Sequence, residues 1–198
     1  MAMFPLGNVL FPGQLLPLQV FEPRYLVMIT EVLAGNGEFG VVLIERGHEV
    51  GGGDLRSNTG CVAVVERAQQ IDDGRVAVLA RGVERLRVEH WFHDDPYPVA
   101  AVTRLARSAT IAEGHAGCAR VRALVERLVQ LVAPDEAVDI AHEQTAEQFA
   151  DEISARVGFG AWDAQRLLAA STLDDQLLVL ATLLEDSITL MQLQQRDR

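Results

Sequence analysis

The chain has 198 residues, a length that fits one large domain or two small ones and is enough to bury a sizeable core. Hydrophobic residues make up 49% and charged residues 23%, which disfavours disordered, collagen-like and disulfide-stapled classes. All 17 basic residues are arginine, and lysine is absent. Since a Walker A phosphate loop, a Schiff base and a Ser-Lys dyad each need a lysine amine, this chain supplies none of them.

The net charge of -11 limits the classes of partner that the chain can bind. Residues 1–105 hold 9 arginines against 13 acids, net -4, and residues 106–198 hold 8 against 15, net -7, so both halves are acidic. Nucleic-acid binders neutralise phosphates with basic residues, which disfavours that class. The apolar stretches are interrupted by charges, and no basic segment precedes an apolar leader, so we expect a cytoplasmic protein with no membrane partner. We expect Cys61 and Cys118 to be reduced.

The first half of the chain has the periodicity of a sheet. Short β-branched runs bounded by glycine predict strands at residues 39–44, 61–65, 75–79, 83–88 and 99–105. Glu22-Pro23 predicts the start of one helix and Gly35 its end, because proline is tolerated in a first turn and glycine favours a helix terminus. This half is predicted to be an antiparallel sheet or small barrel carrying one helix.

The second half has helical periodicity, with helices predicted near residues 118–132, 149–157, 163–170 and 173–195. The last helix has apolar side chains on two opposite faces, one of them formed by Val179, Leu183, Leu190 and Leu193. That second face either packs against another part of the same chain or forms a dimer or partner surface.

Several segments carry a resemblance to a known family. They are residues 4–13 (FPLGNVLFPG), 16–25 (LPLQVFEPRY) with Met28, 39–44 (FGVVLI), Gly60, 73–75 (DGR) and 82–88 (GVERLRV). In order and spacing these resemble the N-terminal substrate-binding domain of the ATP-dependent protease Lon. Residues 149–153 (FADEI), 165–168 (QRLL) and the long last helix look like its helical part, so the resemblance covers nearly the whole chain. Leu86 departs from the family, which usually carries phenylalanine there.

The resemblance implies an α+β fold: a sheet-rich, PUA-like pseudobarrel lobe at residues 1–105, followed by an all-helical lobe at 106–198. It also implies a non-catalytic module that recognises exposed polypeptide segments, with a separate protease as a further candidate partner. Full-length Lon continues into ATPase and Ser-Lys protease domains, so this chain is similar to the stand-alone Lon-domain proteins. We expect the polypeptide surface to include Phe11, Leu15, Leu16, Trp91 and Phe92.

The sequence gives only weak support for a metal site or a phosphate-binding loop. His90 and His93 with Asp94-Asp95 are metal-ligand types, but on a strand positions three apart point to opposite faces. The glycine run at residues 51–54 has no lysine or helix start beside it to bind a phosphate. We therefore expect no metal, no cofactor and no catalytic residue. The alternatives left open are a hydrolase with an unrecognised site and an RNA-binding protein with a PUA-like lobe.

Overall fold

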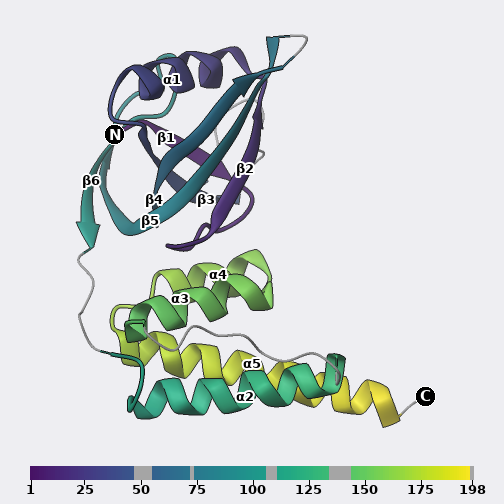
Figure 1. Ribbon diagram of the computed structural model, residues 1–198. Helices are drawn as coiled ribbons and strands as arrows, with labels where there is room; N and C mark the ends of the chain where they lie inside the picture. The colour runs from purple at the N-terminus through teal and green to yellow at the C-terminus, as the bar shows by residue number, and fades with distance from the viewer. Residues whose placement is uncertain (47–54, 72–73, 106–110, 134–143, 197–198) are drawn as a thin grey trace. The chain divides into compact units, whose positions relative to one another are not determined.

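The computed structural model describes residues 1–46, 55–71, 74–105, 111–133 and 144–196; the glycine run at 51–54 and Asp73 lie outside these ranges. Figure 1 shows the elements in chain order. They are β1 (Met3–Leu6), β2 (Leu15–Val20), α1 (Pro23–Ala34), β3 (Glu38–Arg46), β4 (Leu55–Gln70), β5 (Val76–Trp91), β6 (Ala100–Leu105), α2 (Ala116–Val132), α3 (Ala146–Val157), α4 (Ala161–Leu168) and α5 (Leu173–Arg196). The predicted α+β class, with strands first and helices after, is confirmed.

The chain forms two compact units. Unit 1 comprises Met1–Arg107 and Gly158–Ala169, and unit 2 comprises Ser108–Val157 and Ala170–Arg198. Helix α4 therefore groups with the sheet, although it lies between two helices of unit 2 in sequence. Gln165 Nε2 donates hydrogen bonds to Ser57 Oγ at 2.6 Å and to the Thr59 carbonyl at 3.1 Å. The division into residues 1–105 and 106–198 stays a prediction about domains.

The sheet of unit 1 follows the order β1-β3-β4-β5-β2, and β6 pairs with β5 off this path. The pair β1 and β3 is parallel, and the other pairs are antiparallel. Strands β4 and β5 are 16 residues each, so each pairs with different neighbours along its length. The two strands predicted at 75–79 and 83–88 are one strand in the structure, because Gly82 continues the ladder and a bulge beside it absorbs Val83.

Two apolar clusters lie on opposite faces of this sheet. On β3, Phe39 and Val41 belong to the cluster under α1, whereas Val42 belongs to the other cluster. Neighbouring strand residues point to opposite faces, so the sheet is buried on both sides where β3 runs. Gly82 is required by packing: a Cβ there would lie 2.3 Å from the Phe11 carbonyl oxygen, since the segment after β1 crosses β5 at this point.

Unit 2 is built on the packing of α2 against α5. The inward face of α5 includes Leu177, Leu180 and Leu184, each at most 3% exposed. Gln176 Nε2 donates to Asp151 Oδ1 at 3.1 Å, and both side chains are 1% exposed, so α3 is joined to α5 by a buried polar contact.

Helix α5 is the one helix in the described part of the chain that is long and apolar enough to cross a membrane, by length and composition alone. Its inward face is buried within unit 2, and Glu185 and Asp186 occupy the middle of the helix. Two adjacent carboxylates in the middle of a span are costly in hydrocarbon, so these features are typical of a helix that packs in a protein core.

Candidate functional site

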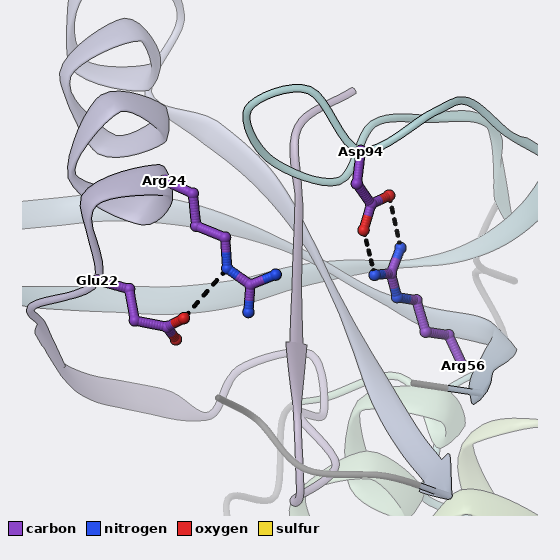
Figure 2. Close-up of polar contacts among 4 residues, drawn as sticks. All are labelled: Glu22, Arg24, Arg56 and Asp94. Carbon is purple, nitrogen blue, oxygen red and sulfur yellow. Dashed lines mark hydrogen bonds and ion pairs between the residues drawn. The ribbon is translucent and has the colours of Figure 1, made fainter. Parts of the chain in front are cut away.

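The segment from Glu22 to Tyr25 is structural in unit 1. Arg24 Nε donates to Glu22 Oε2 at 3.1 Å, and its guanidinium lies 4.5 Å from the Tyr25 ring centroid. Figure 2 shows this pair at the start of α1. The Tyr25 ring stacks on Phe4 of β1 at 4.3 Å between centroids. Arg24 therefore contacts Glu22 and Tyr25 within the first turn of α1, and the Tyr25 ring joins this turn to β1.

A second arginine contact joins the start of β4 to the loop after β5. Arg56 donates through both Nη atoms to the two carboxylate oxygens of Asp94, with Nη1 to Oδ1 at 3.0 Å and Nη2 to Oδ2 at 2.5 Å. Figure 2 shows the two groups facing each other in this bidentate arrangement. The Arg56 guanidinium also lies 4.9 Å from the Trp91 ring centroid. This cation–π contact and the ion pair hold Trp91 in place.

The structure does not bring the predicted polypeptide surface together as one patch. Phe11 is 2% exposed, so its side chain belongs to the core, which corrects the prediction at that position. Leu15 is 45% exposed and Leu16 half-buried, and Leu15 pairs with Arg81 of β5. Trp91 is ten residues further along β5, about 30 Å in an extended strand. The aromatic pair of half-buried Trp91 and exposed Phe92 is therefore a separate region from Leu15 and Leu16.

A groove lies on the face of the sheet beside Leu15. On β5, Val78 and Ala80 point into the core, so the alternate residues Ala77 and Leu79 point outward. Leu79 pairs with Pro17 of β2 on one side and with Arg67 of β4 on the other. Ala77 pairs in the same way with Gln19 and Gln69. We call this region the outer groove; it has a volume of about 400 Å³ and is lined by Pro17, Leu18, Gln19, Arg67, Gln69, Ala77, Val78 and Leu79.

None of the residues that line the outer groove was among the predicted site residues. The strand at 75–79 was predicted, and its alternation could have placed Ala77 and Leu79 on one face. The partners of these residues on β2 and β4 depend on strand register, which no local pattern in the sequence states. The groove thus contains a core of small and medium apolar side chains with an arginine and glutamines at its sides.

The groups with shifted pKa values lie outside this groove. The hydrogen bond to Glu31 raises the pKa of Tyr97 to about 12, and burial raises the pKa of the Cys118 thiol to about 11. A thiol with a raised pKa is a poor nucleophile. Among the described residues no three His, Cys, Asp or Glu side chains cluster as a metal site would require. The geometry of the groove suits binding by shape and apolar contact.

The predicted partner face of α5 is partly open to solvent. Leu190 is 60% and Leu193 51% exposed, while Val179 and Leu183 are half-buried. Leu178, which was not predicted, is 59% exposed on the same helix. The role of this face as a dimer or partner surface stays a prediction.

A comparison with known families identifies the family to which the chain belongs. A family model described as the ATP-dependent protease La (LON) substrate-binding domain matches residues 1–186. The chain belongs to this family. The resemblance drawn from the sequence is thereby confirmed, and the LON substrate-binding domain accounts for both the sheet of unit 1 and most of the helices of unit 2.

Relatives and solved structures agree with this assignment. A Lon protease from Roseiflexus castenholzii is 28% identical over 186 residues, which cover 91% of this chain and 23% of the relative. Lon protease 2 of Bdellovibrio bacteriovorus is 26% identical over 96% of this chain and 25% of its own length. The chain therefore spans about a quarter of the curated relatives that it matches.

Two solved structures share the fold at low sequence identity. A Lon N-terminal domain protein from Xanthomonas campestris has a TM-score of 0.69 at 22% identity, covering 92% of this chain and 96% of its own. The N-terminal domain of a Lon protease from the Mycobacterium avium complex has a TM-score of 0.71 at 18% identity, covering 93% and 97%. The α+β arrangement of this chain is thus that of Lon N-terminal domains.

Proposed function

We propose that this chain is a non-enzymatic module that binds exposed or unfolded polypeptide segments, and that the outer groove is its binding surface. The observation that carries the proposal is an open apolar groove on the sheet of a LON substrate-binding domain. The proposal follows the family, whose printed description is a substrate-binding domain.

The chemistry of the groove supports an extended peptide as ligand. Pro17, Leu79 and Ala77 offer apolar contact in adjacent cross-strand rows, and Leu15 extends this apolar surface by one row. Rows of same-face residues are spaced two residues apart, about 7 Å, so three rows span about 13 Å. An extended segment of four or five residues has the same length and the same side-chain spacing.

The first experiment is a binding titration with a fluorescent unfolded polypeptide. We expect saturable binding that depends weakly on salt, because apolar contact supplies most of the affinity. A folded protein and an RNA oligomer are the control ligands. Leu79→Ser should weaken binding of the unfolded polypeptide, whereas Val83→Ser, an exposed apolar residue elsewhere on β5, should leave it unchanged. Equal binding by both variants would contradict the proposal that the outer groove is the surface.

The same titration separates the two alternative functions. Binding to RNA that falls steeply with salt would indicate a nucleic-acid-binding protein instead. Turnover of peptide or ester substrates by the purified chain, lost on mutation of a single histidine or serine, would indicate a hydrolase.

We also propose that α5 offers a surface for a protein partner, with a second copy of the chain as the simplest one. Leu190→Asp places a charge on an exposed position, so unit 2 should stay folded while any self-association is lost. Analytical ultracentrifugation measures the mass, and circular dichroism controls for folding. A wild-type chain that is monomeric at all concentrations would leave a separate protein, such as a protease, as the partner to be captured by crosslinking.

A further inference from the structure

We infer that the outer groove selects polypeptide segments in which acidic side chains flank the apolar residues. This inference rests on the proposed function and names the class of segment that the groove would take. It is carried by the charges that border the groove in a chain whose overall charge is strongly negative.

Arg67 is the residue that carries the inference. It lies on β4 directly opposite Leu79, is exposed, and borders the groove on the side away from β2. In the described part of the chain it makes no hydrogen bond or ion pair, in contrast to Arg81 on the neighbouring row, which pairs with Glu66. An arginine beside an apolar groove presents five donors in a planar fork that suits a carboxylate.

The residues near Arg67 add to the attraction that its positive charge exerts on acidic segments. Arg75 directly precedes β5 and donates from Nη1 to Gln19 Oε1 at 3.2 Å, so it keeps a positive charge close to the groove. The glutamines Gln19 and Gln69 are neutral, and no carboxylate is among the residues that line the groove. The described residues around the groove are net positive, because Arg67 and Arg75 are both cationic and Glu66, beside Arg67 in sequence, is paired with Arg81. The chain as a whole carries -11. An acidic segment is attracted here and repelled by most of the remaining surface.

The edge of β2 favours recognition by side chains over addition of a strand. β2 is at the end of the strand order, so one of its edges is unpaired within the described sheet. Pro17 in the middle of β2 has no amide hydrogen, so this edge lacks a donor at its centre. A peptide that lies over the face and contacts Leu79 and Arg67 does not need that donor. Side-chain identity, including charge, then decides which segment binds.

The experiment uses short fluorescent peptides that share an alternating leucine and serine centre and differ only in their flanks. The flanks are aspartate, serine or lysine. For the wild-type chain we expect affinity to fall in that order, with aspartate flanks about fivefold tighter than lysine flanks at low salt, since single exposed ion pairs have modest strength. The difference should shrink at physiological salt.

The decisive variant is Arg67→Glu, with Arg87→Glu as its control. Arg87 is an exposed arginine on β5 paired with Glu89, and it lies outside the groove. Arg67→Glu should reverse the preference, so that the lysine-flanked peptide binds more tightly, whereas Arg87→Glu should keep the wild-type order. Circular dichroism and thermal melting confirm that both variants fold.

Two outcomes would overturn the inference in distinguishable ways. If Leu79→Ser weakens all three peptides and Arg67→Glu leaves their order unchanged, the groove binds polypeptide but does not select charge. If neither variant changes binding of any peptide, the proposed function of this groove is wrong, and the charge preference is wrong with it.

Discussion

The elements inside unit 1 pack against one another in a different way from those inside unit 2, and the glycines of the two units show the difference. In unit 1, strands that are distant in sequence approach so closely that backbone contacts backbone: a Cβ at Gly60 would lie 2.1 Å from the Val41 carbonyl oxygen. In unit 2, helices contact each other through side chains, and a Cβ at Gly117 would meet the end of the Leu177 side chain at 2.9 Å. A backbone atom fixed in a sheet cannot yield, whereas the end of a leucine can rotate.

The largest expected effect comes from Gly60→Ala. The new methyl group would force β3 and β4 apart, so we expect unit 1 to lose about 3 kcal/mol of unfolding free energy. Both tryptophans, Trp91 and Trp162, lie in unit 1, so denaturant unfolding followed by tryptophan fluorescence reports on this unit. Gly160→Ala is the control, since a Cβ there meets nothing within 4 Å. A loss below about 1 kcal/mol would show that the sheet yields as easily as a helix pair.

An intermediate effect is expected in unit 2 from Gln176→Met. Methionine keeps the volume of the side chain but removes the amide that donates to the buried Asp151 carboxylate. We expect a loss of about 2 kcal/mol, because a buried carboxylate that loses a donor is costly. Circular dichroism at the helix band measures the unfolding, and Gln194→Met at an exposed position of α5 is the control. Equal stability of the two variants would show that the polar contact between α3 and α5 contributes nothing.

A smaller effect is expected on how the stability of each unit depends on pH, because a different titrating group is shifted in each unit. In unit 1 the hydrogen bond to Glu31 raises the pKa of Tyr97 from 10 to about 12. A raised folded-state pKa means that the contribution to stability is full below pH 10 and is lost as pH rises towards 12. Tyr97→Phe should therefore reduce the alkaline loss of stability in that window, measured by tryptophan fluorescence.

The matching group in unit 2 is Cys118, whose thiol pKa is raised from 9 to about 11 by burial. Its contribution to the stability of unit 2 is full below pH 9 and is lost between pH 9 and 11. Cys118→Ala should therefore reduce the loss of stability of unit 2 in this lower window, measured by circular dichroism at the helix band. Titration of Tyr97 near pH 10 in the folded chain, followed by tyrosinate absorbance, would contradict the expected separation.

The fold was largely predictable from the sequence because its signals are local. Period-2 runs gave the strands, and Pro23 and Gly35 bracketed the first helix within a residue of α1. The placement of α4 in unit 1 was not predictable, since it depends on Gln165 meeting Ser57 and Thr59 more than a hundred residues away. Leu86 remains fully buried although it is smaller than the phenylalanine usual in the family, so this departure left the core closed.

The candidate site was less predictable than the fold. The predicted polypeptide surface combined apolar residues near the N-terminus, including Phe11, with Trp91 and Phe92. Phe11 is buried in the core, and the register of β2 on β5 separates Leu15 from the end of β5 that precedes Phe92. The outer groove depends on three strands meeting in one register, with Arg67, Leu79 and Pro17 in a row. Such a row comes from long-range pairing, and a single sequence contains no local signal for it.

The smallest expected effect is that of Gly117→Ala in α2. The added methyl group would contact Leu177 Cδ1 at 2.9 Å, which a small rotation of the leucine relieves, and alanine favours helix over glycine by up to about 1 kcal/mol. These contributions oppose each other, so we expect the unfolding free energy of unit 2 to change by less than about 0.5 kcal/mol. Circular dichroism measures the change, and Leu177→Val supplies a background in which the contact is relieved. If Gly117→Ala costs as much as Gly60→Ala, and Leu177→Val does not rescue it, then helix packing in unit 2 is as rigid as the strand crossing in unit 1.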